Sequence, residues 1–148
     1  MTSSTWQRRD LFRAEPLARL FLQTLYKYRR AGKFQVHAFV VMPDHFHLLL
    51  TPAREVTLER ALQLIEGGFS HAAKAKLGCG LEIWERGFTD HRIRDGRDFE
   101  HHQEYIHQNP VVEGIVPIAA EYRYCSAYPG FKLDVWPSAA KADLAVGA

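Results

Sequence analysis

The chain has 148 residues, of which 47% are hydrophobic and 24% charged, and its formal net charge is +2 at pH 7. These values are ordinary for one soluble globular domain with room for a core. No stretch is apolar for long enough to span a membrane, segment 1–9 lacks the apolar core of a signal peptide, and the widely separated Cys79 and Cys125 indicate reduced thiols in the cytoplasm.

The first half of the chain has the pattern of a strand, a helix and a hairpin. Residues 2–7 predict a short strand, and a helix opens at Glu15 with Pro16 in its first turn and ends at Gly32. Residues 35–41 and 45–51 then predict two antiparallel strands joined by a tight turn. The second of these strands is apolar on both faces, as expected for a central strand covered by helices.

The second half predicts two more helices around a further strand region. Thr57 can cap a helix that contains the pair Gly67-Gly68, which allows a bend or a close backbone approach, and that ends at Gly78. Residues 83–93 predict a pair of strands, or one strand with a turn. Asp98 can cap a third helix that ends near Asn109, since the following proline disfavours helical geometry before it.

The resulting order, β-α-β-β-α-β-α, suits an α+β fold of the ferredoxin-like kind, with helices packed on an antiparallel sheet. We expect a single domain over residues 1–137 and a disordered tail over 138–148, where the sequence is small and sparsely apolar.

The segment Asp44-His45-Phe46-His47-Leu48 is the strongest chemical signal in the chain. Side chains two apart on a strand share a face, so the two histidines project together while Phe46 turns into the core. Two imidazoles on one face can supply two ligands of a divalent-metal site, although such a pair more often packs in the core or faces solvent.

The third predicted helix can complete that site. Tyr105 and Asn109 are four residues apart and therefore share a helix face, while Ile106 points elsewhere and can anchor the helix. A nearby divalent cation favours the phenolate over the phenol, and an amide oxygen favours Mg²⁺ or Mn²⁺ over structural zinc. The bland alternatives are a core tyrosine and an asparagine that merely ends a helix before proline.

Lysines and arginines gather in three segments, 8–13, 27–33 and 86–97. Each segment alone is typical of a solvated surface, but three in one small chain favour a polyanionic partner. Arg8, Arg9, Arg86, Arg92 and Arg94 are the candidate contacts to such a partner. If the polyanion is a nucleic acid, Trp6, Trp84, Phe88 and Trp136 are candidates for stacking on its bases, with burial in the core as the alternative for each.

Two blocks of the sequence, residues 37–50 and 105–116, closely resemble the signature blocks of the REP-associated tyrosine transposases. Residues 83–94 look like the middle block of the same family, which belongs to the HUH single-tyrosine transposases. The resemblance implies a ferredoxin-like fold and metal-dependent cleavage of single-stranded DNA at hairpin-forming repeats. Position 101 is His, so a second tyrosine one turn before Tyr105 is absent, which favours the one-tyrosine class.

By this resemblance His45 and His47 are metal ligands, Asn109 matches the third ligand, and Tyr105 is the nucleophile that takes the 5′ phosphate. Glu66 departs from the family, because relatives often carry a basic residue there. The expected cofactor is Mg²⁺ or Mn²⁺, the expected partner is hairpin DNA, and we expect a monomeric cytoplasmic protein. The alternatives are a catalytically silent, domesticated transposase that binds hairpins, and a metal hydrolase in which Tyr105 only orients the substrate.

Overall fold

Three antiparallel strands form the centre of the molecule in the order β1-β3-β2, in a computed structural model that describes residues 1–78 and 82–136. They are β1 (Thr2–Ser4), β2 (Phe34–Met42) and β3 (His45–Pro52). The central position of β3 and its hairpin with β2 confirm the sequence-based predictions. The tail predicted for residues 138–148 lies outside the described residues.

The edge of the sheet beside β1 differs from the prediction. Within the described residues, segment 82–95 forms no regular strand, and isolated bridges pair Thr2 with Thr89 and Thr5 with Trp84. Gly87 interrupts the ladder between these bridges, because its φ of 76° turns the chain out of extended geometry. The first strand is also shorter than the predicted 2–7, since a 3₁₀ turn (Trp6–Arg8) follows it.

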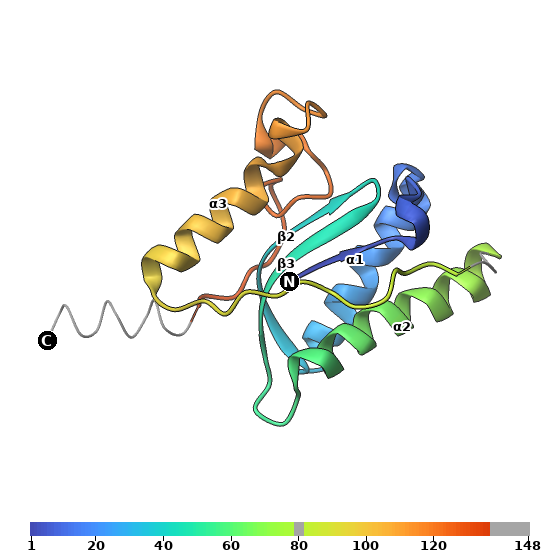
Figure 1. Ribbon diagram of the computed structural model, residues 1–148, viewed down its shortest axis with the longest axis horizontal. Coiled ribbons are helices and arrows are strands. Elements are labelled where there is room, and N and C mark those ends of the chain that lie inside the picture. Colours follow the sequence, from blue (N-terminus) through green and yellow to red (C-terminus); the bar gives the residue numbers. More distant parts are fainter. Residues whose placement is uncertain (79–81, 137–148) are drawn as a thin grey trace, which may run out of the picture.

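Helices α1 (Glu15–Arg30) and α2 (Leu58–Leu77) cover one face of the sheet, and α3 (Gly96–Val112) covers the other (Figure 1). The predicted start and end signals hold for the first two. Thr57 accepts a hydrogen bond from the Arg60 amide at 3.1 Å, and Gly78 closes α2 with a φ of 67°. No helix in the described part of the chain is long and apolar enough to span a bilayer.

Both predicted ends of α3 are wrong by a few residues. The helix begins at Gly96 and is capped by Asp95, whose carboxylate accepts from the Asp98 amide at 2.8 Å. It continues past Asn109 to Val112 with Pro110 inside it. The φ of proline is compatible with a helix, so the ring does not prevent the chain from continuing for two more residues, although Pro110 donates no backbone hydrogen bond.

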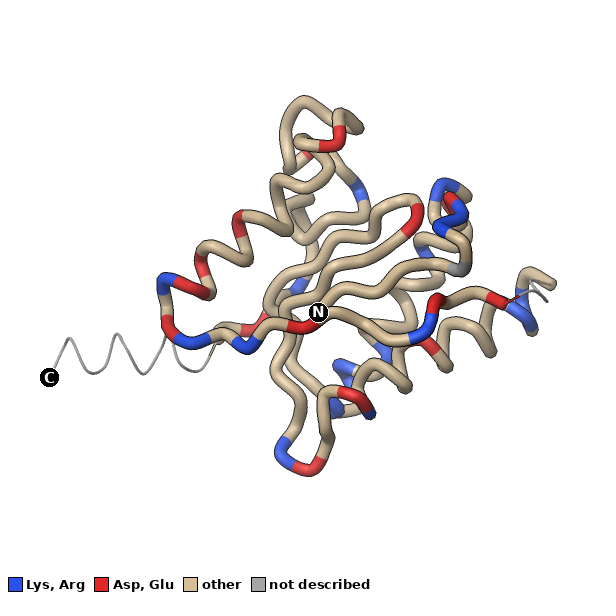
Figure 2. Tube along the Cα trace, viewed as in Figure 1, with Lys and Arg blue, Asp and Glu red and all other residues tan. Residues whose placement is uncertain are grey.

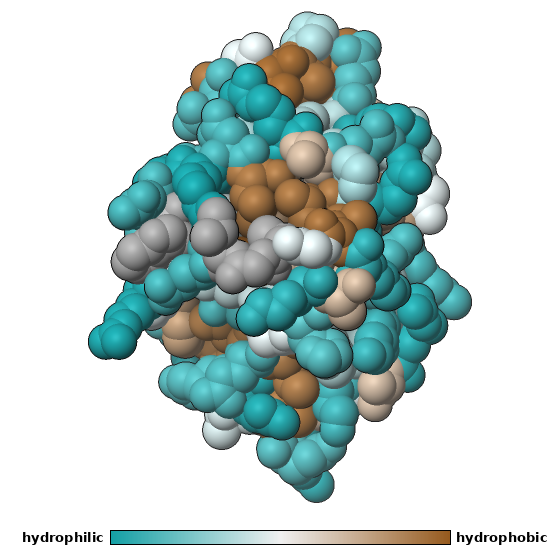
Figure 3. Space-filling view, turned by 90° about the vertical axis from the view of Figure 1, so that its right-hand side faces the viewer, coloured by the Kyte–Doolittle hydropathy of each residue, from teal (hydrophilic) through white to brown (hydrophobic). Residues whose placement is uncertain are grey.

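The two faces of the sheet carry different cores. Under α1 and α2 the buried rings of Phe12, Phe21, Phe46 and Phe69 and the partly buried ring of Trp84 form a group with centroids 4.8–6.2 Å apart. Under α3 a smaller cluster packs Ile106 against Val40, Met42 and Leu49. Hydrophilic side chains cover most of the face seen in Figure 3, with apolar side chains exposed in separate patches.

The Gly67-Gly68 pair lies within an unbroken α2. A Cβ added at Gly68 would lie 2.8 Å from the Tyr28 ring on α1, whereas one at Gly67 would meet nothing within 4 Å. The second glycine therefore serves the close approach of α1 and α2, which is one of the two roles predicted for the pair.

Candidate active site

His45 and His47 lie side by side on β3, as the strand alternation predicted. Their ring centroids are 4.9 Å apart, while Phe46 between them is fully buried under α1 and α2. The pairing of His47 with Val40 and of His45 with Met42 on β2 fixes this alternation. The strand therefore holds the two imidazoles on the face that α3 covers.

Hydrogen bonds orient both rings through the same nitrogen atom. The Asp44 carboxylate accepts from Nδ1 of His45 at 2.6 Å, and the Thr2 hydroxyl occupies Nδ1 of His47 at 2.6 Å. Within the described residues, the Nε2 atoms of both rings have no hydrogen-bond partner. Occupied Nδ1 atoms with available Nε2 atoms are the arrangement that metal-ligating histidines commonly show.

His47 also has the protonation state that a ligand needs. Burial, followed by the positive charges of His45, the N-terminal amine and Arg8, lowers the pKa of His47 to about 4. The imidazole is therefore neutral at pH 7 and offers a lone pair. Next to the pair, the pKa of Asp44 is also lowered, because its hydrogen bond with His45 and the nearby charges together outweigh the opposing effect of its burial.

Helix α3 brings Tyr105 against this histidine pair. The Tyr105 ring lies 5.5 Å from the His47 ring, centroid to centroid, and the side chain is 55% exposed. Ile106, the next residue, is buried against β2 and β3 and anchors the helix, as predicted. The tyrosine is therefore held at the histidines while remaining open to a large substrate.

Asn109 lies one turn after Tyr105 and is buried, with an exposed fraction of 7%. Its Oδ1 is a buried polar atom without a hydrogen-bond partner within the described part of the chain. An unsatisfied buried oxygen is costly and calls for an explanation. A hard-cation ligand is such an explanation, so His45, His47 and Asn109 fit the Mg²⁺ or Mn²⁺ site that the family resemblance implies.

A cavity of about 260 Å³ lies between the sheet and α3. His47 and Thr2 line it from the sheet, and Tyr105 and His102 line it from the helix. His91 closes it from the extended segment before α3. The candidate nucleophile and one candidate ligand therefore share a single hollow.

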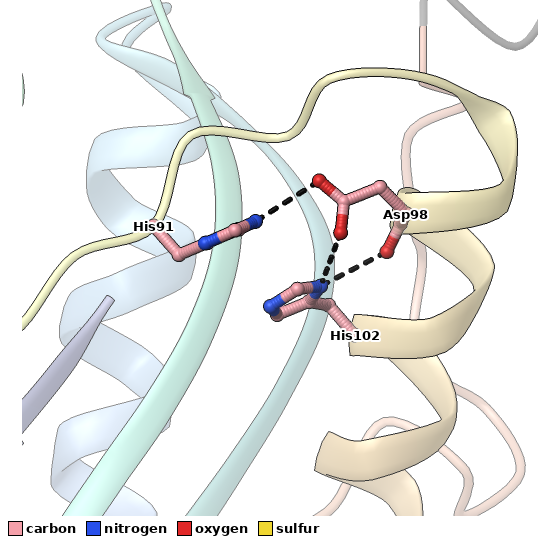
Figure 4. Close-up of side chains that lie close together, drawn as sticks. All are labelled: His91, Asp98 and His102. Atoms are coloured by element: carbon pink, nitrogen blue, oxygen red, sulfur yellow. Dashed lines mark hydrogen bonds and ion pairs between the residues drawn. The ribbon is translucent and has the colours of Figure 1, made fainter.

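A second cluster on the same hollow was not found from the sequence. His91, Asp98 and His102 place one nitrogen or oxygen atom each within 4.8 Å of one another, close enough to hold a metal ion (Figure 4). Nδ1 of His102 lies 3.1 Å from an Asp98 carboxylate oxygen. The sequence signal for this cluster is the spacing of four residues between Asp98 and His102, which places both side chains on the same face of a helix.

Arg8 and Arg9 lie in the turn after β1, Arg86 lies in the segment between α2 and α3, and Arg92 and Arg94 lie just before α3 (Figure 2). Arg8 pairs with Asp44 at 3.0 Å, Arg9 donates to the Glu82 carbonyl, and Arg94 lies 3.7 Å from Asp98. Arg86 and Arg92 are exposed. Some of these arginines are therefore engaged in contacts within the protein. Among the residues of α3 that are charged at neutral pH, most are acidic.

Three of the candidate stacking aromatics take the alternative role of packing. Trp84 packs against Phe12, Phe46 and Phe69, with its indole donating to the Glu66 carbonyl at 3.1 Å. Phe88 lies partly buried against the same core, and Trp136 stacks on Phe99 with centroids 4.9 Å apart. The side chain of Trp6 lies outside the described part of the structure.

Comparison with protein families gives a match over residues 2–109 to the family described as "Transposase IS200 like". The chain belongs to the IS200-like transposases. An Escherichia coli K12 protein, "REP-associated tyrosine transposase", is 31% identical over 113 residues, and a Haemophilus influenzae protein, "Putative REP-associated tyrosine transposase", is 27% identical over 114. These matches cover 75% and 70% of this chain and 65% of each relative, so they span slightly under two thirds of the relatives' length.

A solved structure extends this likeness to three dimensions. It carries the description "Structure of the REP associates tyrosine transposase bound to a REP hairpin" and matches with a TM-score of 0.72 at 26% identity. The match covers 93% of this IS200-like transposase and 87% of the solved chain. The α+β fold of the HUH transposases and the resemblance to the REP-associated branch are both confirmed.

Proposed function

We propose that this transposase is a metal-dependent single-stranded DNA endonuclease and strand transferase that acts at hairpin-forming repeats through a 5′-phosphotyrosine intermediate. The observation that carries the proposal is the position of Tyr105: an exposed phenol against His47, one turn before a buried and unsatisfied Asn109 oxygen. A tyrosine that only packs in the core would be buried, and its packing would not explain the adjacent histidine or the unsatisfied amide oxygen.

The reaction follows from the chemistry of the phenol. The Tyr105 oxygen attacks the phosphorus of a phosphodiester and forms a new O–P bond, while the bond to the 3′ oxygen breaks. The phenolic proton is lost, and the departing 3′ oxygen takes up a proton as a hydroxyl. Because the phosphotyrosine link keeps the energy of the phosphodiester, a 3′ hydroxyl can later attack it and rejoin the strands.

A bound divalent cation would neutralise charge on the phosphate and favour the phenolate. His45 and His47 would hold it through Nε2, with Asn109 supplying an oxygen. Asp44 and Thr2 keep the two rings turned for this role through their hydrogen bonds at Nδ1. The ordinary pKa of a phenol, near 10, explains why the nucleophile needs such help at neutral pH.

Hairpin DNA is the proposed partner, because the structural neighbour is described as bound to a REP hairpin. Arg8, Arg9, Arg86, Arg92 and Arg94 are the proposed contacts to its backbone. Arg8 and Arg94 form ion pairs with acidic residues of the protein, and Arg9 donates a hydrogen bond to a backbone carbonyl. DNA binding would therefore compete with these contacts. We propose that the protein acts as a monomer in the cytoplasm.

The test is covalent capture. Labelled single-stranded hairpin DNA is incubated with the protein and Mg²⁺ or Mn²⁺, and denaturing gels are examined for a protein–DNA adduct. We expect an adduct with the native chain and none with Tyr105→Phe, which removes one oxygen and keeps the ring. Tyr128→Phe is the matched control and should form the adduct normally, because Tyr128 lies near Phe131, outside the site.

Two other outcomes would select the alternatives. Cleavage that survives in Tyr105→Phe means that water is the nucleophile and that the enzyme is a hydrolase. Tight hairpin binding without cleavage, in either metal, means a catalytically silent binding protein.

A further inference from the structure

The cluster of His91, Asp98 and His102 joins two segments of the chain. His91 lies on the extended segment before α3, whereas Asp98 and His102 lie one turn apart on α3 (Figure 4). Nε2 of His91 is 2.9 Å from one Asp98 oxygen, and Nδ1 of His102 is 3.1 Å from the other. The two imidazoles stack with centroids 4.3 Å apart and an interplanar angle of 17°.

These distances suit a small four-coordinate ion. Bonds of about 2.0–2.2 Å to nitrogen and oxygen set neighbouring ligand atoms roughly 3.3 Å apart in a tetrahedron. Two of the three separations are already 2.9 and 3.1 Å, and all three atoms lie within 4.8 Å of one another. To bind one ion, the two rings would also have to turn out of their stacked arrangement, because a ring nitrogen binds a metal in the plane of its ring.

The donor set indicates which ion. Two imidazoles and one carboxylate form the ligand set of many zinc sites that keep a fourth position open. Mg²⁺ prefers oxygen ligands and is a poor match. Hydrogen bonds, that of His91 first, lower the pKa of Asp98 to about 2, so the carboxylate is ionised at neutral pH.

Hydrogen bonds within the protein explain part of the cluster without an ion. Asp98 accepts from the Arg94 amide at 3.0 Å and thereby supports the start of α3. Nε2 of His91 and Nδ1 of His102 lie within hydrogen-bond distance of Asp98 oxygen atoms, and an ion bound through these two nitrogens would replace those hydrogen bonds. All three side chains retain some exposure, 43%, 12% and 30% in chain order, so an ion can reach them from solvent.

We propose that His91, Asp98 and His102 form a second metal site, for Zn²⁺ or a similar transition-metal ion, that fastens the start of α3 to the segment before it. His91 and His102 line the cavity that also holds His47 and Tyr105. His102 precedes Tyr105 by three residues and is its neighbour on the helix surface. The ion would therefore fix the helix that carries the candidate nucleophile, without taking part in the cleavage reaction.

The test is zinc binding to the metal-free protein, measured by titration calorimetry in the double variant His45→Ala/His47→Ala, which removes the other metal site. We expect one zinc per chain. When His91→Ala is added to this double variant, the zinc affinity should fall by more than about 100-fold. Losing a residue that only hydrogen-bonds to a ligand costs less, roughly 10–100-fold. His71→Ala, which removes an exposed histidine of α2, is the matched control and should leave the affinity unchanged.

Hydrogen exchange supplies the structural readout. Zinc should slow amide exchange in residues 96–102 of the otherwise native chain and should not do so in His91→Ala. Because His91 lies outside the helices, this variant keeps the α3 cap, and circular dichroism verifies that it is folded. Unchanged zinc affinity in both His91→Ala and Asp98→Asn overturns the proposal. The measurement needs no DNA, so its result is independent of whether Tyr105 forms an adduct.

Discussion

The two faces of the sheet are built differently. On one, α1 and α2 enclose a continuous group of aromatic rings that includes Phe21 and Phe46. On the other, a smaller cluster around Ile106 anchors α3, and beside it lies a cavity lined by both apolar and polar side chains. The first face supplies most of the buried apolar surface, and the second carries the candidate site residues.

The difference shows how one three-stranded sheet can hold its strands firmly on one face and carry a more mobile helix on the other. A helix anchored by few apolar contacts can shift at small cost, which suits the role proposed for Tyr105. The strand beneath it cannot shift, because its opposite side is packed into the aromatic core. Four perturbations test this division, in order of expected effect.

Phe21→Ala should have the largest effect on stability. Phe21 is fully buried between Phe12, Phe46 and Phe69, so its truncation leaves a cavity that costs about 3–5 kcal/mol. Urea denaturation followed by circular dichroism measures the loss. A cost below 1 kcal/mol would mean that the aromatic face is not the main source of stability.

Acid should act on the opposite face through His47. Its pKa of about 4 in the folded chain lies below the unfolded value of about 6.5, so between these values the unfolded chain binds more protons. Stability is therefore full above pH 6.5 and falls toward pH 4, by as much as roughly 3 kcal/mol. Denaturation with EDTA present at several pH values measures the slope.

The His47→Asn variant is the control for this slope. His37 also has a lowered pKa, because burial outweighs its interactions with Asp134, and it destabilises the fold in the same direction. The variant should therefore flatten the slope partly rather than remove it. An unchanged slope would contradict the assignment to His47.

Ile106→Val should separate stability from activity. Removing one methylene from the α3 anchor costs about 0.5–1.5 kcal/mol, and the protein stays folded. Because Tyr105 is the preceding residue, we expect adduct formation to fall more than the folded fraction does. Val41→Ala, on the other side of the sheet, is the comparison: at a similar or larger stability cost it should leave adduct formation in the folded fraction unchanged.

The smallest effect is expected from the glycine pair in α2. Gly67→Ala should stabilise the protein by up to about 1 kcal/mol, because the helix gains propensity and the added methyl group meets nothing. Gly68→Ala should gain less or lose, since its methyl group meets the Tyr28 ring. Thermal denaturation of both variants measures the difference, and equal gains would mean that Tyr28 moves aside freely.

The sequence predicted the elements whose signals are local. Thr57, Gly78 and the alternation around Phe46 each act within a few residues, and each was confirmed. The proximity of Tyr105 to His47 was expected as one possible docking of α3, and the resemblance to the transposase family turned that possibility into a prediction. The assigned roles of these residues remain predictions.

The missed features depend on contacts that the sequence does not display. Residues 83–93 have strand character, but Gly87 takes a left-handed turn and leaves only isolated bridges to β1. Proline at position 110 biases the preceding residue without forbidding a helix, so α3 continues to Val112. The convergence of His91 on Asp98 depends on the path of an irregular segment, which no periodicity reveals.

The β2–β3 turn carries a consequence for evolution of the chain. Because β3 presents His45 and His47 on one side and Phe46 on the other, its register couples the proposed metal site to folding. Inserting or deleting a single residue at Pro43 or Asp44 would reverse both sides of the strand at once. Lineages of this transposase can therefore lose activity by point substitution and keep the fold, but a length change in this turn removes both together.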